Sequence, residues 1–158
     1  MDKLSDEHIK RAVELFGKGY NCAQSVCAAW ADSYGLTEEQ MLRISSSFGA
    51  GIGRMRKTCG AACGMFILAG LEYGNASGSA EDKQLNYEVV QQLAKRFEER
   101  NGALECHDLL SGKGIRTTTD ARPDERTQEY YRKRPCPQIV EEAARIWLEF
   151  LKEKNRQK

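Results

Sequence analysis

Apolar residues recur every three or four positions along most of the chain, which is the spacing of amphipathic α-helices. Near the N-terminus, Ile9 and Phe16 lie on one face of a predicted helix, with Ser5 as its expected N-cap. Gly17 interrupts this pattern and Asn21 restarts it. The periodicity therefore predicts a chain built from helices, and no segment alternates in the way that a strand does.

Helix-capping signals divide the chain into further segments. Asn21 with Gln24 and Thr37 with Gln40 have the spacing of a capping box, and Thr58 is the expected N-cap of the most apolar helix. With the apolar stripes, these signals predict helices over 22–34, 38–46, 59–73 and 80–101, a short helical turn over 106–110, and a last helix opened by Pro135-Cys136-Pro137.

Two stretches depart from the amphipathic pattern. The apolar run 61–71 is interrupted by Gly64 and Gly70 and is too short to cross a bilayer, so we expect a buried helix and no membrane insertion. Residues 111–134 are polar and show no period, which is typical of a long loop. The expected fold is all-α: a compact bundle of about five to six helices with a long polar loop before the last helix.

The length of 158 residues suits one domain, expected to span 1–158 with an ordered core over roughly 5–151. Such a domain buries roughly 70% of the surface of its unfolded chain, so it needs neither a disulfide nor a metal merely to fold. The polar N-terminus contains no secretory h-region, so a cytoplasmic location is expected. Six cysteines in that reducing compartment point to metal or redox chemistry before structural disulfides.

Three cysteines are predicted at the N-termini of helices. Cys22, Cys59 and Cys136 each fall at, or one residue after, an expected N-cap. Free N–H groups and the positive end of the helix dipole stabilise a thiolate there. Basic residues within 54–57 and 132–134 precede two of these cysteines. We therefore expect thiols with lowered pKa values, as a nucleophile or a metal ligand requires.

The other three cysteines carry weaker local signals. Cys106 is followed by His107, which is expected either to hydrogen-bond the thiol or to lie in solvent. Cys27 and Cys63 lie inside predicted helices on apolar faces, where small hydrophobic core residues are the better interpretation. Cys63 is one helical turn beyond Cys59, so it is also a candidate resolving thiol.

Several familiar motifs are absent. The chain has no C-x-x-C, which excludes a thioredoxin-type motif and a ribbon-type zinc site, and no C-x-x-C-H, so haem attachment is not expected. The glycine-rich stretch 47–53 lacks the βαβ context of a nucleotide-binding loop. We interpret Gly49 and Gly51 as points where the backbone approaches another group, such as a thiol site with its cofactor. Gly60 and Gly64 in the next helix indicate either close helix packing or room for a bulky group beside the helix.

The motif set resembles a known family. Asn21-Cys22-Ala23-Gln24, Phe48-Gly49-Ala50-Gly51 and Cys59-Gly60-Ala61 with Gly64, followed by the single cysteines Cys106 and Cys136, are similar to the C_GCAxxG_C_C family of redox-active proteins. The resemblance extends from about Ser5 to Phe150 and implies a helical prokaryotic redox protein. It also implies that the family cysteines are Cys22, Cys59, Cys106 and Cys136, with Cys27 and Cys63 as additions.

Four functions are compatible with these residues. An iron–sulfur cluster for electron transfer would use Cys22, Cys59, Cys106 and Cys136, and we rank it slightly ahead because it uses all four. Thiol–disulfide exchange or redox sensing would use Cys59 as the attacking thiolate and Cys22 as the resolving thiol. The remaining two are a structural zinc site in an interaction module, and a helical interaction domain with incidental cysteines.

The expected partner is another redox protein, whether this chain is an oxidoreductase or an electron-transfer component. The segment 111–134 has a positive balance that suits an acidic partner. The overall net charge of +1 gives no general attraction to nucleic acid, and no nucleotide cofactor is expected. A homodimer is compatible with the sequence.

Overall fold

The computed structural model describes all residues from Met1 to Lys158, and its regular elements are all helices. Its α-helices are α1 (Glu7–Gly17), α2 (Cys22–Ala28), α3 (Glu38–Ser45), α4 (Gly60–Tyr73), α5 (Ala80–Asn101), α6 (Cys106–Ser111), α7 (Gln128–Lys133) and α8 (Cys136–Arg156), with 3₁₀ helices η1 (Ala31–Tyr34) and η2 (Ser46–Phe48). The all-α class is confirmed. The expected five to six helices were too few, because α6 was expected only as a short helical turn and α7 lies in sequence that was expected to be a loop.

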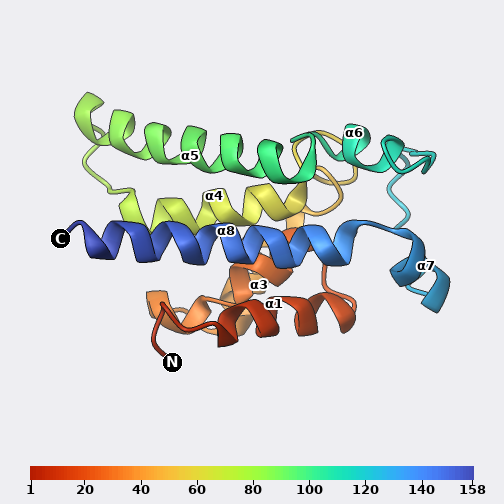
Figure 1. The fold of residues 1–158 in the computed structure, drawn as a ribbon, viewed down its shortest axis with the longest axis horizontal. Helices are drawn as coiled ribbons and strands as arrows, with labels where there is room; N and C mark the ends of the chain where they lie inside the picture. The colour runs from red at the N-terminus through yellow and green to blue at the C-terminus, as the bar shows by residue number, and fades with distance from the viewer.

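Helix α8 forms the centre of the bundle and packs against α1, α2, α4 and α5 (Figure 1). Helix α4 lies between α2 and α5, and α3 packs on α2. The apolar faces of these helices meet in one core that includes Phe16, Trp30, Leu68, Phe97 and Trp147, all almost fully buried. None of the helices is both long enough and apolar enough to cross a membrane.

Three helices, α2, α3 and α5, start at the expected capping residues. Asn21 and Thr37 form complete capping boxes, and the hydroxyl of Ser79 accepts a hydrogen bond from the backbone N–H of Asp82. Two caps differ from expectation by one residue: Asp6 rather than Ser5 precedes α1, and Cys59 rather than Thr58 precedes α4. Cys136 is likewise the first residue of α8 rather than its N-cap, which is Pro135.

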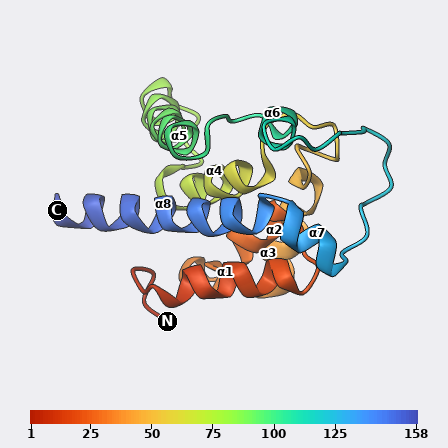
Figure 2. The ribbon, with the colours of Figure 1, turned by 45° about the vertical axis from the view of Figure 1, so that its right-hand side comes forward.

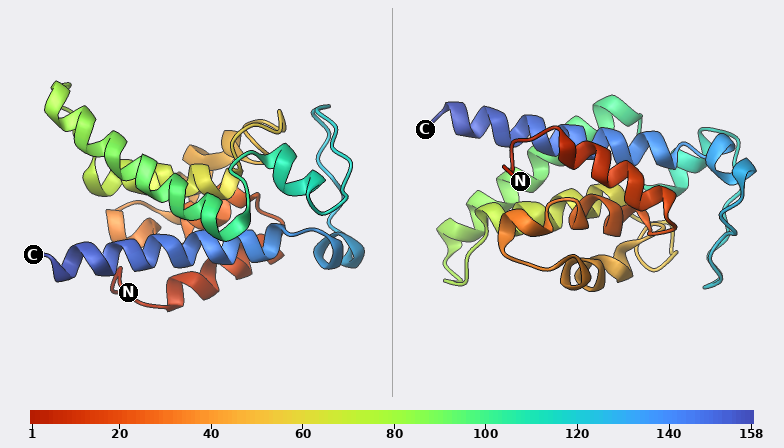
Figure 3. Two further views of the ribbon diagram at one scale, coloured as in Figure 1. Left: turned by 45° about the horizontal axis from the view of Figure 1, so that its top comes forward. Right: turned by 90° about the horizontal axis from the view of Figure 1, so that it is seen from below.

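The long polar loop is shorter than predicted. Residues 128–133 form α7, whose N-cap Thr127 accepts a hydrogen bond from the backbone N–H of Tyr130. Between α6 and α7 the segment 112–127 contains no helix or strand and contributes no residue to the apolar core. It runs along the outside of one end of the bundle (Figures 2 and 3). We call this segment the cover.

Candidate functional site

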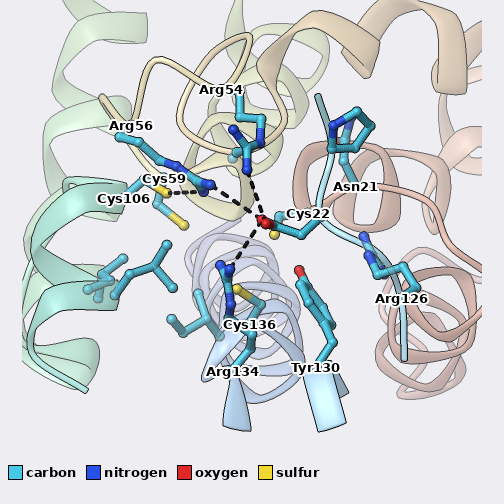
Figure 4. A pocket seen from close by; sticks show the side chains of 17 residues that line it. Asn21, Cys22, Arg54, Arg56, Cys59, Cys106, Arg126, Tyr130, Arg134 and Cys136 are labelled. Atoms are coloured by element: carbon cyan, nitrogen blue, oxygen red, sulfur yellow. Dashed lines mark hydrogen bonds and ion pairs between the residues drawn. The ribbon is translucent and has the colours of Figure 1, made fainter. Parts of the chain in front are cut away.

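Four cysteines from four helices line one cavity of about 110 Å³. Cys22, Cys106 and Cys136 are the first residues of α2, α6 and α8, and Cys59 is the N-cap of α4. A position at the start of a helix was expected for Cys22, Cys59 and Cys136, and the structure shows the same position for Cys106. Figure 4 shows the labelled side chains gathered around this pocket.

Cys59 and Cys106 are held near each other by a short antiparallel pairing. The backbone N–H of Cys59 donates to the carbonyl of Leu104 at 2.9 Å, and that of Cys106 donates to the carbonyl of Lys57 at 2.6 Å. Between these bonds, Thr58 and Glu105 form an isolated β-bridge. The start of α4 and the start of α6 are therefore linked by backbone hydrogen bonds rather than by their side chains alone.

Cys22 and Cys136 form a second pair, in which each thiol shifts the pKa of the other. The interaction with Cys136, together with burial, raises the pKa of Cys22 well above its usual value. The interaction with Cys22, helped by Arg134 and Tyr130, lowers the pKa of Cys136 to about 7 although burial opposes this. The pair thus favours a thiolate on Cys136 and a retained proton on Cys22.

The expectation of lowered pKa values at all the helix starts is wrong. Burial raises the pKa of Cys59 to about 12, despite backbone hydrogen bonds from α4 that act in the other direction. Burial also raises the pKa of Cys106, although Arg56 opposes this shift. In the protein without bound metal, Cys59 is therefore a poor candidate for the attacking thiolate, and Cys136 is a better one.

Glycines allow the elements around the thiols to approach each other. A Cβ atom on Gly60 would lie 2.9 Å from the carbonyl oxygen of Phe48 and 3.3 Å from the Cβ of Cys22. A Cβ on Gly51 would lie 2.7 Å from the Cβ of Cys106. These distances are too short for a side chain, so both positions require glycine as long as the thiols keep their places.

For the other two glycines noted in the sequence, Gly49 and Gly64, an added Cβ would meet residues other than the cysteines. A Cβ on Gly49 would overlap the side chain of Asn21, the N-cap beside Cys22. A Cβ on Gly64 would lie 2.9 Å from the Cβ of Val26, so this glycine serves the packing of α4 on α2.

The loop between η2 and α4 has a left-handed backbone. Ala50, Gly51, Ile52, Gly53 and Arg54 have φ values of 53°, 75°, 66°, 56° and 65°. For residues other than glycine, this conformation costs roughly 1–2 kcal/mol each. Such strain persists where surrounding contacts impose it, and it concentrates at functional sites.

The strained loop directs two arginines into the cavity. Arg54 and Arg56, the latter also with a positive φ of 60°, are only 8% and 6% exposed. Nη1 of Arg56 donates to Sγ of Cys106 at 3.7 Å. Both guanidinium groups also bind the carboxylate of Asp124 in the cover, as does Arg134 at the end of α7.

Arg126 lines the same cavity but has different partners. It donates to the carbonyls of Phe16 and Tyr20 at 2.9 and 3.0 Å, and its guanidinium lies 4.2 Å from the ring centre of Phe16. It also stacks over Tyr130 at 5.0 Å. Arg126 therefore fastens the end of the cover to α1.

Cys27 and Cys63 do not line the cavity. The thiol of Cys27 donates to the carbonyl of Gly64 at 3.4 Å, and that of Cys63 to the carbonyl of Thr58 at 3.8 Å. Both are buried, and burial raises their pKa values to about 12 and about 11. His107 is exposed and hydrogen-bonds the hydroxyl of Thr117 instead of the thiol of Cys106.

No three His, Cys, Asp or Glu side chains converge closely enough to hold one metal ion. The four cavity thiols therefore surround a space instead of a point. The volume of that space, about 110 Å³, is comparable to the ~150 Å³ cavity that can hold benzene.

The fold and this site define a small helical protein with four thiols and several arginines around one cavity. The family model described as "Putative redox-active protein (C_GCAxxG_C_C)" matches residues 20–150, and the chain belongs to this family. Comparison with curated proteins and with solved structures gives no match.

Sequence reasoning missed Asp124, Arg126 and Tyr130 as parts of the site. All three lie in the polar stretch that the sequence predicts to be a loop, where no apolar period marks an inward face. Thr127 was the available signal, since a threonine before a short run with aromatic residues is a usual helix start. Of the basic residues noted before Cys136, only Arg134 lines the cavity.

Proposed function

We propose that the protein binds an iron–sulfur cluster through Cys22, Cys59, Cys106 and Cys136 and transfers electrons to a partner protein. The observation that carries this proposal is the convergence of four thiols, from helices far apart in the sequence, on one arginine-lined cavity. When bound, such a cluster would accept and release single electrons.

The charges around the cavity support an anionic occupant. Arg54, Arg56 and Arg134 share the carboxylate of Asp124, and Arg54 also pairs with the exposed Asp120, so three positive charges meet two negative ones there. A buried charge that lacks a partner is costly. A cluster ligated by four thiolates is a net anion and would offset this excess, while the bond from Arg56 to Cys106 would tune its potential.

The arrangement of the thiols also favours a cluster over a single zinc ion. Zinc needs four ligands within about 2.3 Å of one centre, whereas a cluster distributes its ligands over several metal atoms. The thiols here line a cavity without meeting at a point.

Anaerobic reconstitution with iron and sulfide tests the proposal. The wild-type protein should retain both elements after desalting and show a broad visible charge-transfer band. Serine at Cys22, Cys59, Cys106 or Cys136 should abolish or strongly reduce iron retention, whereas Cys27→Ser and Cys63→Ser are matched controls that should retain it. Full iron retention by Cys106→Ser would contradict the four-ligand site, and bound zinc without iron uptake would favour the zinc alternative.

A second candidate function, thiol–disulfide exchange, is favoured by the contact between Cys22 and Cys136. Cys136 would attack a disulfide of a partner protein and form a mixed disulfide with release of one partner thiol. Cys22 would then displace the second partner thiol. The partner is reduced by two electrons, and the chain retains a Cys22–Cys136 disulfide.

Peptide mapping distinguishes this candidate from the cluster. Oxidation of the metal-free protein by a model disulfide should produce a Cys22–Cys136 link, and Cys59 and Cys106 should be dispensable for it. A mixture of links, or none, would rule out this exchange reaction.

A further inference from the structure

Three arginines meet at a single carboxylate on the thiol cavity. Nη2 of Arg54 donates to Oδ1 of Asp124 at 3.1 Å, and the Nη2 atoms of Arg56 and Arg134 donate to Oδ2 at 3.4 and 3.1 Å. In Figure 4, the dashed lines from these arginines converge in the middle of the pocket. Arg54 also pairs with the exposed Asp120 at 3.5 Å, so three guanidinium groups share two carboxylates, of which only Asp124 bonds to all three.

We propose that Arg54, Arg56 and Arg134 form a binding site for a small oxyanion, such as a free carboxylate, and that Asp124 occupies this site as an internal substitute. Planar guanidinium groups are well matched to the paired oxygen atoms of such anions. The site adjoins the four thiols in the same cavity, so the anion would bind beside the redox groups as a substrate or an effector. It does not depend on a bound cluster and therefore goes beyond the proposed function.

The backbone of the arginines and that of Asp124 differ in how firmly they are held. Arg54 and Arg56 belong to the left-handed loop, whose amides bond back to η2 and to the loop itself. Asp124 belongs to the cover, which places no residue in the apolar core. Polar contacts hold the cover, among them the bonds from Arg54 to the carbonyls of Thr118 and Asp120 at 3.4 and 2.6 Å.

Exchange of Asp124 for an external anion is balanced in charge. Although partial burial acts in the other direction, Arg134, Arg54 and Arg56 lower the pKa of Asp124, so its side chain is an anion. A monoanion that replaces it leaves the total charge of the cavity unchanged. The carboxylate is also 36% exposed, so the entrance to the site already faces solvent.

Formate is a suitable probe because it is the smallest carboxylate. The affinity for formate is measured by isothermal titration of the full-length, metal-free protein in two variants, Asp124→Asn and the matched control Asp120→Asn. In the wild-type protein the side chain of Asp120 is 63% exposed and pairs with Arg54 alone, at 3.5 Å. Since removal of the internal competitor frees charge-assisted hydrogen bonds, Asp124→Asn should bind formate at least about tenfold more tightly than Asp120→Asn. Addition of Arg134→Gln to Asp124→Asn should remove this gain. Equal affinities of the two asparagine variants would overturn the proposal.

A measurement on the wild-type protein covers the case in which Asp124→Asn does not fold. Formate should speed tryptic cleavage after Arg116 in the cover, relative to sodium chloride at equal ionic strength, because chloride lacks paired oxygen atoms. Equal cleavage rates in the two salts would mean that formate does not displace Asp124. Formate binding by metal-free protein would support the anion site even if iron reconstitution failed, so the two proposals fail separately.

Discussion

The two ends of the bundle differ in backbone conformation and in the kind of side chain that they bury. At one end, which we call the thiol end, α2, α4, α6 and α8 begin around the cavity, the backbone is left-handed over residues 50–54, and buried arginines hold the cover. Towards the C-terminus of α8, at what we call the aromatic end, Tyr73, Trp147 and Phe150 pack edge-on or stacked between regular helices.

This difference indicates that the aromatic end contributes mainly to the stability of the fold, whereas the thiol end carries the reactive groups. At the aromatic end Trp147 and Phe150 are fully buried within a regular helix, as expected of a region that contributes mainly to the free energy of folding. The thiol end contains strained residues and buried charges, which are costly for folding. Substitutions at the two ends should therefore have separable effects on stability and on the site.

The largest effect is expected at the aromatic end. Trp147→Ala removes a fully buried indole and should lower the free energy of unfolding by about 3–5 kcal/mol. Urea unfolding followed by circular dichroism measures this loss. Leu85→Ala is the control on α5, where the side chain is 50% exposed, and should change stability by less than about 0.5 kcal/mol. A loss of less than about 1 kcal/mol for Trp147→Ala would show that the aromatic end is not the main source of stability.

A second prediction compares two glycines within α4. Gly60→Ala places a Cβ against the backbone of η2 and against Cys22, so it should cost about 1–3 kcal/mol. It should also reduce iron retention after reconstitution. At Gly70 a Cβ meets nothing within 4 Å, so Gly70→Ala should stabilise the helix by about 0.5–1 kcal/mol. If both variants behave alike, close approach at the thiol end is not the reason for Gly60.

The third prediction concerns the pH dependence of the contribution from Asp124. Its pKa is lowered by Arg134, Arg54 and Arg56 although burial opposes this, so its stabilisation is present above the unfolded value of 3.8. It is lost as the pH falls through the lower folded value. Asp124→Asn should therefore cost about 1–2 kcal/mol at neutral pH, discounted for partial exposure.

This cost should shrink as the pH falls below about 4, because the Asp124 carboxylate is protonated first in the unfolded state and stays ionised in the folded state down to its lower pKa. Unfolding free energies measured by urea at both pH values check the trend. Asp120 also pairs with Arg54 and has a pKa lowered by hydrogen bonding, so Asp120→Asn is the necessary comparison. A cost that does not change with pH would indicate that Asp124 acts through packing instead of charge.

The smallest effects test the strain of the left-handed loop. Ile52→Gly should raise the free energy of unfolding by about 1 kcal/mol, because glycine adopts a φ of 66° without steric cost. Gly53→Ala should lower it by a similar amount, since its φ is 56° and the only neighbour of a new Cβ is the carbonyl of Ser47 at 3.8 Å. Thermal unfolding of the Ile52→Gly and Gly53→Ala variants measures both changes in stability. Changes of the same sign would show that backbone strain does not control the stability of this loop.

Local signals explain how much of the fold could be predicted. The capping boxes at Asn21 and Thr37 and the start at Ser79 depend on residues three positions apart, so they can be recognised without tertiary information. The positions of Cys22, Cys59 and Cys136 at helix starts follow from the same local rules. Helix α7 was missed because its polar residues show no apolar stripe, and its aromatic rings pack mainly on Arg126 and Phe16.

The sequence by itself determined the helical class, the family and the four cysteines that merit attention, because periodicity, caps and motif spacing are local properties. Only the tertiary structure decided that Cys59 approaches Cys106, that Cys22 contacts Cys136, and that burial raises the pKa of Cys59. The contact of Asp124 with three arginines is likewise visible only in the tertiary structure. Burial and pairing of charges depend on distant residues, such as Arg54 and Asp124, which are 70 positions apart, and no local pattern encodes which of these residues meet.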